Sequence, residues 1–263
     1  FQNMGQYHFN ESFYADLENK ITVKNEPYPH AFIKNFLPDS LSKNISDDFR
    51  FPKKDPEAGI EDKVFQKTKK GLSQINLMPN SIKDLINRLN SRDFISILEK
   101  KFKIKNLVGD PTLFGGGMHE SFRGGYLKIH SDFIFIKKRK LKRMLNLLIY
   151  LNEDWEESWG GAIELWNEDM SKMFLKVFPN INNVVIFRTD YESNHGFPDP
   201  LNCPENKSRK SIALYYYTPY DKLIKPKKKF YAIWKKRPGV KEEKFGDNLS
   251  FFKKLKNKFF FRI

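Results

Sequence analysis

The spacing of apolar residues changes at Asp110-Pro111, and this change constrains the fold more than any other feature of the sequence. Before this point, apolar residues recur every three or four positions, as they do on the buried face of a helix. After it, they occur in short β-rich runs that glycine, asparagine and proline interrupt. Helices followed by strands predict an antiparallel β core with helices packed on one side, a mainly β fold of the α+β class.

The N-terminal part is expected to contain one short strand and three helices. Pro38 and Asp39 are typical of a helix start, and Ser81 with Asp84 resembles a capping box. Residues 50–75 are charged and have no clear period, so we expect a loop there. The expected elements are a strand at 31–33 and helices at 39–49, 82–89 and 94–102.

The β-rich part has no internal repeat and divides into short runs. We expect strands at 116–123, 126–130, 144–151, 161–166, 183–188 and 210–217. The chain then divides into an N-terminal strand and helices at 1–109, a β core at 110–220 and a basic extension at 221–263. We expect these three parts to form one structural domain.

The formal charge of +15 is concentrated near the C-terminus. Residues 221–263 contain fifteen Lys and Arg against four Asp and Glu, a net of +11, which leaves +4 for residues 1–220. Basic residues interleaved with aromatic ones can bind single-stranded nucleic acid, and the charge also suits an anionic membrane surface. The alternative is a compositional bias towards Lys, Asn, Ile and Phe. We favour a further possibility over nucleic-acid binding, namely a solvated terminal extension that packs on the core.

The cysteine content and the hydropathy bear on the compartment. A single cysteine, Cys203, rules out an internal disulfide, which fits a reducing compartment. No stretch approaches the roughly 18 uninterrupted apolar residues that a membrane span needs, and no signal pattern is visible at the N-terminus. We therefore expect a soluble, cytoplasmic protein without a membrane span.

The strongest candidate for chemistry is His130-Ser131-Asp132, at the end of a predicted strand. Residues i and i+2 of a strand project to the same face, so this imidazole and this carboxylate should point together into the sheet's interior. His195 follows the apolar run 183–188 and precedes Gly196, at a strand edge or turn. Two histidines and one carboxylate on one face of an octahedral ion leave three positions open, which suits non-haem Fe(II). The alternative is that both histidines are ordinary structural or surface residues.

Arg209 precedes the apolar run 211–217 and is a candidate for binding a carboxylate. An arginine at the base of a β core is costly to bury unless a carboxylate meets it, and its planar fork suits bidentate binding. A dicarboxylate cosubstrate would meet that need. The alternative places Arg209, beside Lys207 and Lys210, in a solvated loop.

Five blocks carry a resemblance to a known family. They are GYLKIHSD at 125–132, NLLIYLNEDW at 146–155, WGGAIELW at 159–166, HG at 195–196 and RKSIALYYY at 209–217. In this order they resemble the prolyl 4-hydroxylase-like branch of the 2-oxoglutarate/Fe(II)-dependent oxygenase superfamily. The resemblance covers about residues 110–220, with a weaker similarity over 27–36.

The resemblance implies a fold and a set of site residues. The fold would be a double-stranded β-helix, a cupin-like jelly-roll, with the helices of residues 80–103 against one sheet. The catalytic residues would be the iron ligands His130, Asp132 and His195. Arg209 and the hydroxyl of Tyr150 would bind the distal carboxylate of 2-oxoglutarate.

The resemblance also implies pocket residues, for which core packing is the alternative. Tyr126 would line the cosubstrate pocket, and Ile163 and Trp166 would line the substrate pocket. For these three, an ordinary place in the β core explains the sequence equally well, and for Tyr150 a place as a strand aromatic in the core is the less favoured alternative. Gly160-Gly161 should allow a close backbone approach or a bend at a strand start.

The implied activity is that of a dioxygenase that hydroxylates its substrate with Fe(II), 2-oxoglutarate and O₂, with ascorbate as a candidate reductant. The protein would hold the ligands, orient the cosubstrate and keep the pocket dry. The substrate stays open between a prolyl residue in a peptide or protein, a small molecule and a glycan. Alternatives of another class are a non-catalytic protein that binds nucleic acid or a membrane through its tail, and a cupin-like metal protein that does not use 2-oxoglutarate.

Overall fold

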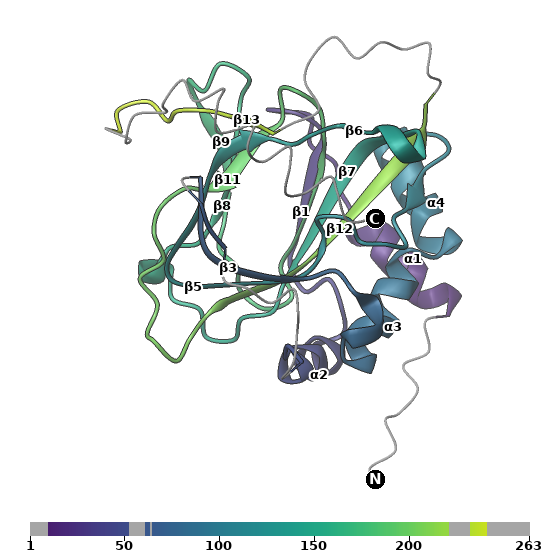
Figure 1. Cartoon of the computed structure of the whole chain (residues 1–263). Coiled ribbons are helices and arrows are strands. Elements are labelled where there is room, and N and C mark those ends of the chain that lie inside the picture. Colours follow the sequence, from purple (N-terminus) through teal and green to yellow (C-terminus); the bar gives the residue numbers. More distant parts are fainter. Residues whose placement is uncertain (1–9, 53–60, 64, 221–231, 241–263) are drawn as a thin grey trace.

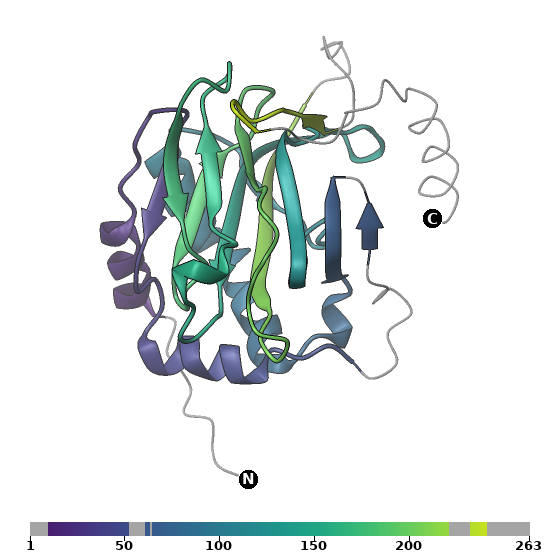
Figure 2. The ribbon, with the colours of Figure 1, turned by 90° about the vertical axis from the view of Figure 1, so that its left-hand side faces the viewer.

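The computed structural model describes residues 10–52, 61–63, 65–220 and 232–240. Within them, strands join into a 13-stranded sheet whose continuous path runs β1-β10-β7-β12-β5-β11-β8-β9. The pairings along this path are antiparallel. The sheet rolls into a nearly closed barrel with helices on one side, as Figures 1 and 2 show. This confirms the expected jelly-roll with supporting helices.

The strands of the path mostly pair with strands that are distant in sequence. Along the path they are β1 (His30–Ile33), β10 (Val184–Arg188), β7 (Leu141–Tyr150), β12 (Arg209–Pro219), β5 (Gly117–Ser131), β11 (Asn194–Phe197), β8 (Ile163–Trp166) and β9 (Met173–Val177). Five more strands pair outside it: β2 (Glu61–Lys63), β3 (Gln66–Leu72), β4 (Val108–Gly109), β6 (Phe135–Ile136) and β13 (Ile233–Trp234).

Four helices gather at one face of the barrel (Figure 1). They are α1 (Glu11–Lys20), α2 (Asp39–Asp48), α3 (Asn80–Leu89) and α4 (Arg92–Phe102), and short 3₁₀ turns η1 (Ile75–Leu77), η2 (Lys137–Arg139) and η3 (Glu157–Trp159) complete the described elements. The hydroxyl of Tyr216, fully buried on β12, donates to the carbonyl oxygen of Leu89 at 2.8 Å. This bond joins the end of α3 to the middle of the sheet.

The alternation of side chains along β7 separates the two cores of the molecule. Leu145, Leu147 and Ile149 face the helices and belong to the main hydrophobic cluster. Tyr150 points the other way and packs in a second cluster inside the barrel. Asn146 lies on the same inner face as Tyr150, so this face of β7 carries polar side chains into the barrel. The opposite face of β7 carries apolar side chains that pack against the helices.

Most predicted elements of the N-terminal part are confirmed, and two predictions there are wrong. The strand at 31–33 and the three helices are present within a residue or two. Residues 50–75, expected to be a loop, contain β2 and β3 instead, because β3 pairs with the long strand β5. The capping box is also wrong: α3 begins at Asn80 after Pro79, and the Ser81 hydroxyl donates to Asp48 at 2.6 Å.

The C-terminal part differs from the prediction in the extent and number of strands. β5 is one strand across the two runs expected at 116–123 and 126–130, with Gly124 at a φ of +78° where the break was expected. The strands β4, β6, β9, β11 and β13 and the helix α1 were not predicted. Most of the basic extension, 221–231 and 241–263, lies outside the described residues, so predictions for it stay open there. In the described parts of the chain, no helix has the length and apolar character to cross a membrane.

Candidate metal centre

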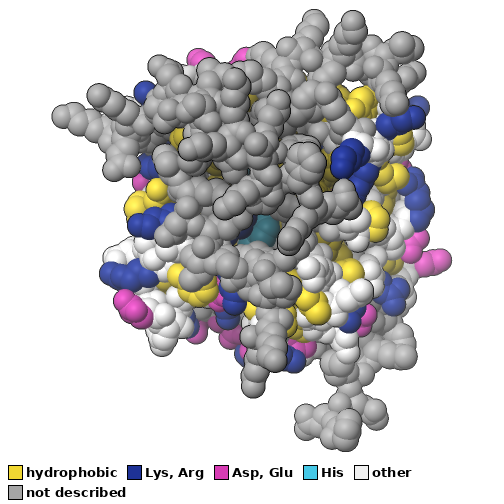
Figure 3. Space-filling view, in the orientation of Figure 1, with side chains coloured by type: hydrophobic (Ala, Val, Ile, Leu, Met, Phe, Trp, Pro, Cys, Tyr) yellow, Lys and Arg dark blue, Asp and Glu magenta, His cyan; other side chains and the backbone are white. Residues whose placement is uncertain are grey.

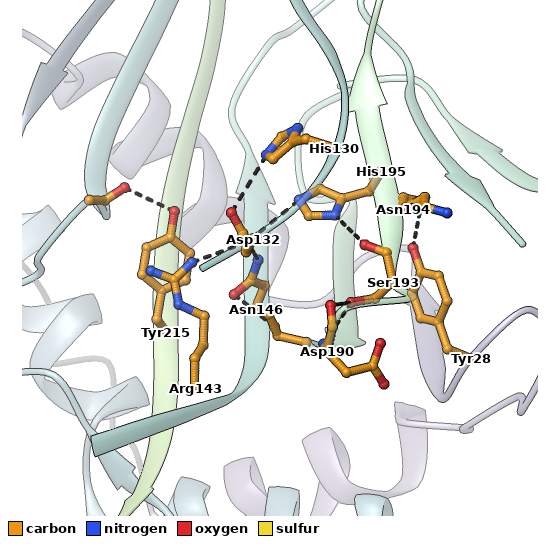
Figure 4. Close-up of polar contacts among 12 residues, drawn as sticks. Tyr28, His130, Asp132, Arg143, Asn146, Asp190, Ser193, Asn194, His195 and Tyr215 are labelled. Carbon is orange, nitrogen blue, oxygen red and sulfur yellow. Dashed lines mark hydrogen bonds and ion pairs between the residues drawn. The ribbon is translucent and has the colours of Figure 1, made fainter. Parts of the chain in front are cut away.

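The structure brings His130, Asp132 and His195 together at one end of the barrel (Figure 4). One ligand atom from each lies within 4.8 Å of the others. His130 is on β5 and His195 on β11, and the two residues are direct partners in the antiparallel pairing of these strands. Asp132 lies just past the end of β5, which ends at Ser131, so the expected same-strand placement of the carboxylate is wrong by one residue.

Backbone carbonyls orient both imidazoles. The Nδ1 of His130 is 2.9 Å from the carbonyl oxygen of Lys128, and the Nδ1 of His195 is 2.9 Å from that of Ser193. A carbonyl oxygen can only accept, so Nδ1 donates in each ring, which leaves Nε2 as the nitrogen that faces Asp132. The Nε2 atoms lie 3.5 and 3.6 Å from the carboxylate of Asp132. The Nε2 atoms of both histidines and the Asp132 carboxylate therefore face the same point.

Burial keeps the His195 ring neutral. The side chain is 5% exposed, and this desolvation, with the neighbouring His130, lowers the pKa of His195 to about 4. A neutral imidazole is the form that binds a metal, because the proton and the metal compete for the same nitrogen. In the space-filling view, a histidine side chain is visible on the face shown in Figure 3.

Asp132 is held as a carboxylate by two neighbours. Its Oδ2 accepts from Asn146 Nδ2 at 2.6 Å and lies 3.1 Å from an Arg143 nitrogen. Burial alone would raise the pKa of Asp132, but Arg143 and the two imidazoles hold it well below its usual value. Thr189 in turn donates to the amide oxygen of Asn146 at 3.1 Å. Thr189 therefore orients the Asn146 amide, which in turn orients the carboxylate.

The sequence reasoning missed Arg143. Its side chain is 1% exposed, and its guanidinium carbon lies 4.1 Å from the ring centroid of Phe133 and 3.8 Å from that of Tyr215. Strict alternation along β7 would turn Arg143 towards the helices. The pairing with β12 shifts its register between Tyr216 and Tyr217, and this irregularity turns Arg143 into the barrel. A single sequence carries no signal for such a shift.

Arg209 and Tyr150 meet inside the barrel. Arg209 is 6% exposed, its Nε donates to the Gly161 carbonyl at 2.8 Å, and an Nη nitrogen donates to the Tyr150 hydroxyl at 3.2 Å. Within the described residues, no carboxylate forms an ion pair with Arg209. Burial lowers the pKa of Arg209, and the nearby Tyr150 opposes this. The solvated loop that was the alternative for Arg209 is therefore not what the structure has.

Gly161 has to be a glycine for this contact to form. A side-chain carbon at this position would lie 2.6 Å from Leu201 and 3.1 Å from the Arg209 side chain, and its φ is +75°. Few residues other than glycine adopt this backbone conformation, and none has room here. The expected close approach at Gly160-Gly161 is confirmed.

The remaining predicted pocket residues are not all in one place. Ile163 packs beside Tyr150 in the cluster inside the barrel. The Nε1 of Trp166 donates to Glu164 at 2.8 Å, and Glu164 pairs with Gly196 on the face opposite Ile163. Tyr126 is half-buried on β5, with the Lys128 nitrogen 4.9 Å from its ring centroid. Ile163 is thus the member of this group that lies beside Tyr150.

A jelly-roll barrel with two histidines and a carboxylate at one end has the donor set of the mononuclear non-haem iron enzymes. Residues 117–217 match the family model of the 2OG-Fe(II) oxygenase superfamily. Residues 117–217, most of the β core, are therefore a 2OG-Fe(II) oxygenase domain. This confirms the superfamily that the five sequence blocks indicated.

Comparison with solved structures finds similar chains at low identity. One is a prolyl-4-hydroxylase from Pseudomonas putida, 15% identical over 80% of this chain and 98% of that chain, with a TM-score of 0.45. Another is a prolyl hydroxylase from Trichoplax adhaerens in complex with a hypoxia inducible factor peptide fragment, 18% identical over 78% and 91%, with a TM-score of 0.49. A third is HygX from Streptomyces hygroscopicus with nickel, 2-oxoglutarate and hygromycin B bound, 10% identical over 78% and 86%, with a TM-score of 0.46. No curated protein matches the sequence.

Proposed function

We propose that the chain is a hydroxylase in which His130, Asp132 and His195 hold Fe(II) and Arg209 with Tyr150 binds 2-oxoglutarate. The observation that carries the proposal is the convergence of two imidazole nitrogens and one carboxylate within 4.8 Å. Because Nδ1 of each histidine donates to a backbone carbonyl, the rings are held with Nε2 towards the shared point. Three neutral or anionic donors fit a divalent cation.

The chemistry of the donor set favours iron over zinc. Structural zinc sites close four positions and commonly use thiolates, whereas Cys203 is buried in another cluster with Trp155 and Phe197. Two histidines and one carboxylate leave positions for a cosubstrate and for O₂. When bound, Fe(II) with 2-oxoglutarate supplies the oxidising chemistry, which consumes O₂ and releases succinate and CO₂. Ascorbate stays a candidate reductant.

The residues of the chain would position and shield the reactants. Arg209 has a buried positive charge without a carboxylate partner among the described residues, which suits the distal carboxylate of 2-oxoglutarate. The Tyr150 hydroxyl accepts from Arg209 and keeps its own proton to donate to the same carboxylate. Asn146 and Arg143 keep Asp132 ionised and oriented. Tyr126 stays a candidate wall of the cosubstrate pocket, and Ile163 and Trp166 stay candidate substrate-pocket residues.

The substrate class is the open part of the proposal. We retain a prolyl residue in a peptide or protein as the first candidate, with a small molecule or a glycan as the alternative. A non-catalytic role in binding nucleic acid or a membrane surface is less favoured, because the three metal donors and Arg209 are all present and oriented.

The decisive test is the conversion of 2-oxoglutarate to succinate by anaerobically Fe(II)-loaded protein after addition of O₂. Proline-containing peptides and a metabolite mixture would be screened for stimulation of this turnover. His195→Ala should abolish it, whereas His30→Ala, a buried histidine outside the donor set, should retain it. Equal turnover in the parent and the His195 variant would refute the metal site.

A further inference from the structure

The segment 232–237 lies across the end of the barrel that carries the histidines. Ile233 and Trp234 form β13, which pairs with Ser131 and His130 of β5. The backbone nitrogen of Lys235 donates to the Ile129 carbonyl at 2.8 Å. Figure 1 shows β13 at the top of the barrel, above β11. The segment therefore adds a strand to β5 at the point where β5 delivers His130.

Trp234 stands directly beside the proposed ligand His130. Partners in an antiparallel pair project to the same face of a sheet, so Trp234, His130 and His195 share the inner face. The rings of Trp234 and His130 have centroids 4.8 Å apart at 37°. On its other side, Trp234 stacks on Phe65 with centroids 4.6 Å apart at 13°. An aromatic wall thus borders the metal centre, and its inner member comes from the C-terminal segment.

The other end of the segment is fastened by ion pairs. The two Arg237 terminal nitrogens contact the Asp199 carboxylate at 2.5 and 3.1 Å, and one lies 3.8 Å from Glu164. Asp199 follows β11, and Glu164 is on β8. Because β5, β11 and β8 are neighbours, the segment reaches from the outer edge of β5 to β8.

These contacts hold the segment against the barrel, but they are few enough for the segment to open locally. β13 contains two residues, and its side chains are only half-buried. Elements with few buried contacts open locally at low free-energy cost compared with global unfolding. The bidentate pair with Asp199, which is itself 60% exposed, is one of the contacts that hold the segment.

We propose that residues 232–237 are a strap that controls access to the metal centre, with Trp234 as the side chain that an entering substrate contacts and Arg237 as its latch. The proposal rests on the proposed function, because it needs a metal between His130 and His195. It assigns a role in substrate selection to a segment outside the matched domain, which ends at residue 217. The strap shields the centre and contributes no ligand.

A gate and a structural support make different kinetic predictions. Opening a gate raises the rates of metal entry and metal release by the same factor, so the equilibrium affinity stays constant. Loss of support for His130 changes the affinity. The probe is Co(II) alone, followed by quenching of tryptophan fluorescence on binding and by its recovery when EDTA removes the metal. Trp234→Phe should lose part of the quenching at unchanged affinity, which identifies the reporter.

The latch variants are Arg237→Ala and Asp199→Ala in the full chain, with Glu205→Ala as the control for an exposed carboxylate elsewhere. Loss of a bidentate charged pair should raise both Co(II) rates about five- to tenfold in each latch variant, with the dissociation constant within twofold of the parent. The proposal would be overturned if both Co(II) rates were unchanged in both latch variants. It would also be overturned if the rates changed only together with the Co(II) dissociation constant.

Amide hydrogen exchange of residues 233–235 supplies a second measurement that needs no metal. The parent should protect these amides, and the latch variants should lose several-fold protection while the Glu205 variant keeps it. Unprotected amides in the parent would refute the strap, whatever the metal data show. A parent that binds no Co(II), but whose 233–235 amides are protected, would instead refute the proposed metal centre, and with it the strap's role in access.

Discussion

Removing the guanidinium of Arg209 should weaken 2-oxoglutarate binding by two orders of magnitude or more and leave metal affinity unchanged. Arg209 is 6% exposed and donates to the Gly161 carbonyl and the Tyr150 hydroxyl, so its remaining N–H groups are available to a ligand. Breaking a buried charge pair costs about 3 to 5 kcal/mol, because the surviving charge stays buried. At about 1.4 kcal/mol per decade, this is a weakening of roughly a hundredfold to a few thousandfold.

The assay is calorimetric titration of 2-oxoglutarate into Mn(II)-loaded protein, with Mn(II) affinity measured separately. Lys210→Ala is the matched control, because this neighbouring cation points towards Phe49, with its nitrogen 5.9 Å from the ring centroid, rather than into the barrel. Arg209→Lys should recover part of the affinity, since an ammonium cannot reproduce the planar fork. If Arg209→Ala binds 2-oxoglutarate within threefold of the parent, the assignment of the cosubstrate pocket is wrong.

Four further outcomes are expected. Alanine at any one of the three metal ligands should abolish Mn(II) binding by titration; retained affinity in a variant would remove that residue from the site. Tyr150→Phe should weaken 2-oxoglutarate binding by about 0.5 to 3 kcal/mol, as for one hydrogen bond to a charged group, and a loss as large as that of Arg209→Ala would contradict this. Burial lowers the pKa of His195 to about 4. An unfolded histidine takes up its proton near pH 6.5, so the stability of the metal-free protein should fall as the pH drops from about 6.5 to about 4, by roughly 3 kcal/mol in total. Urea unfolding across this window measures the fall, and a His195→Gln variant with the same slope would exclude this residue as the cause. Deleting residues 240–263 should leave 2-oxoglutarate turnover nearly intact, because the strap ends before them; a tenfold loss of succinate formation would show that these residues act on the site.

Local patterns predicted the parts of the fold that depend on local spacing. Leu85 and Leu89 on α3, and the apolar run that became β10, have periods that a sequence displays directly. The site could be predicted from residue type and order, because His130, His195 and Arg209 sit in blocks with a recognisable sequence. Their spatial meeting depends on the pairing of β5 with β11, which local patterns do not report.

The failures share a physical cause in contacts between distant segments. β3 reads as a charged loop, since its lysines line a strand whose burial comes from β5, about fifty residues away. Arg143 looks like part of a basic turn until the shifted register with β12 turns it inward. Ser81 had the residue type of a helix cap, but Asp48 on α2 accepts from its hydroxyl instead. In each case a partner far along the chain decided the outcome.

The ion pair between Arg143 and Asp132 couples the binding of the metal to the binding of 2-oxoglutarate. Before any ion enters, the charge of the Asp132 carboxylate is already balanced by the Arg143 guanidinium and the His195 imidazole is uncharged, so the site offers a divalent cation little net attraction. A metal ion bound alone would therefore make the barrel interior more positive. 2-Oxoglutarate bound alone would contact Arg209 but would have no metal to bind. Each should bind more tightly in the presence of the other, and by linkage the two enhancements are equal. The metal and the cosubstrate should therefore bind with positive cooperativity.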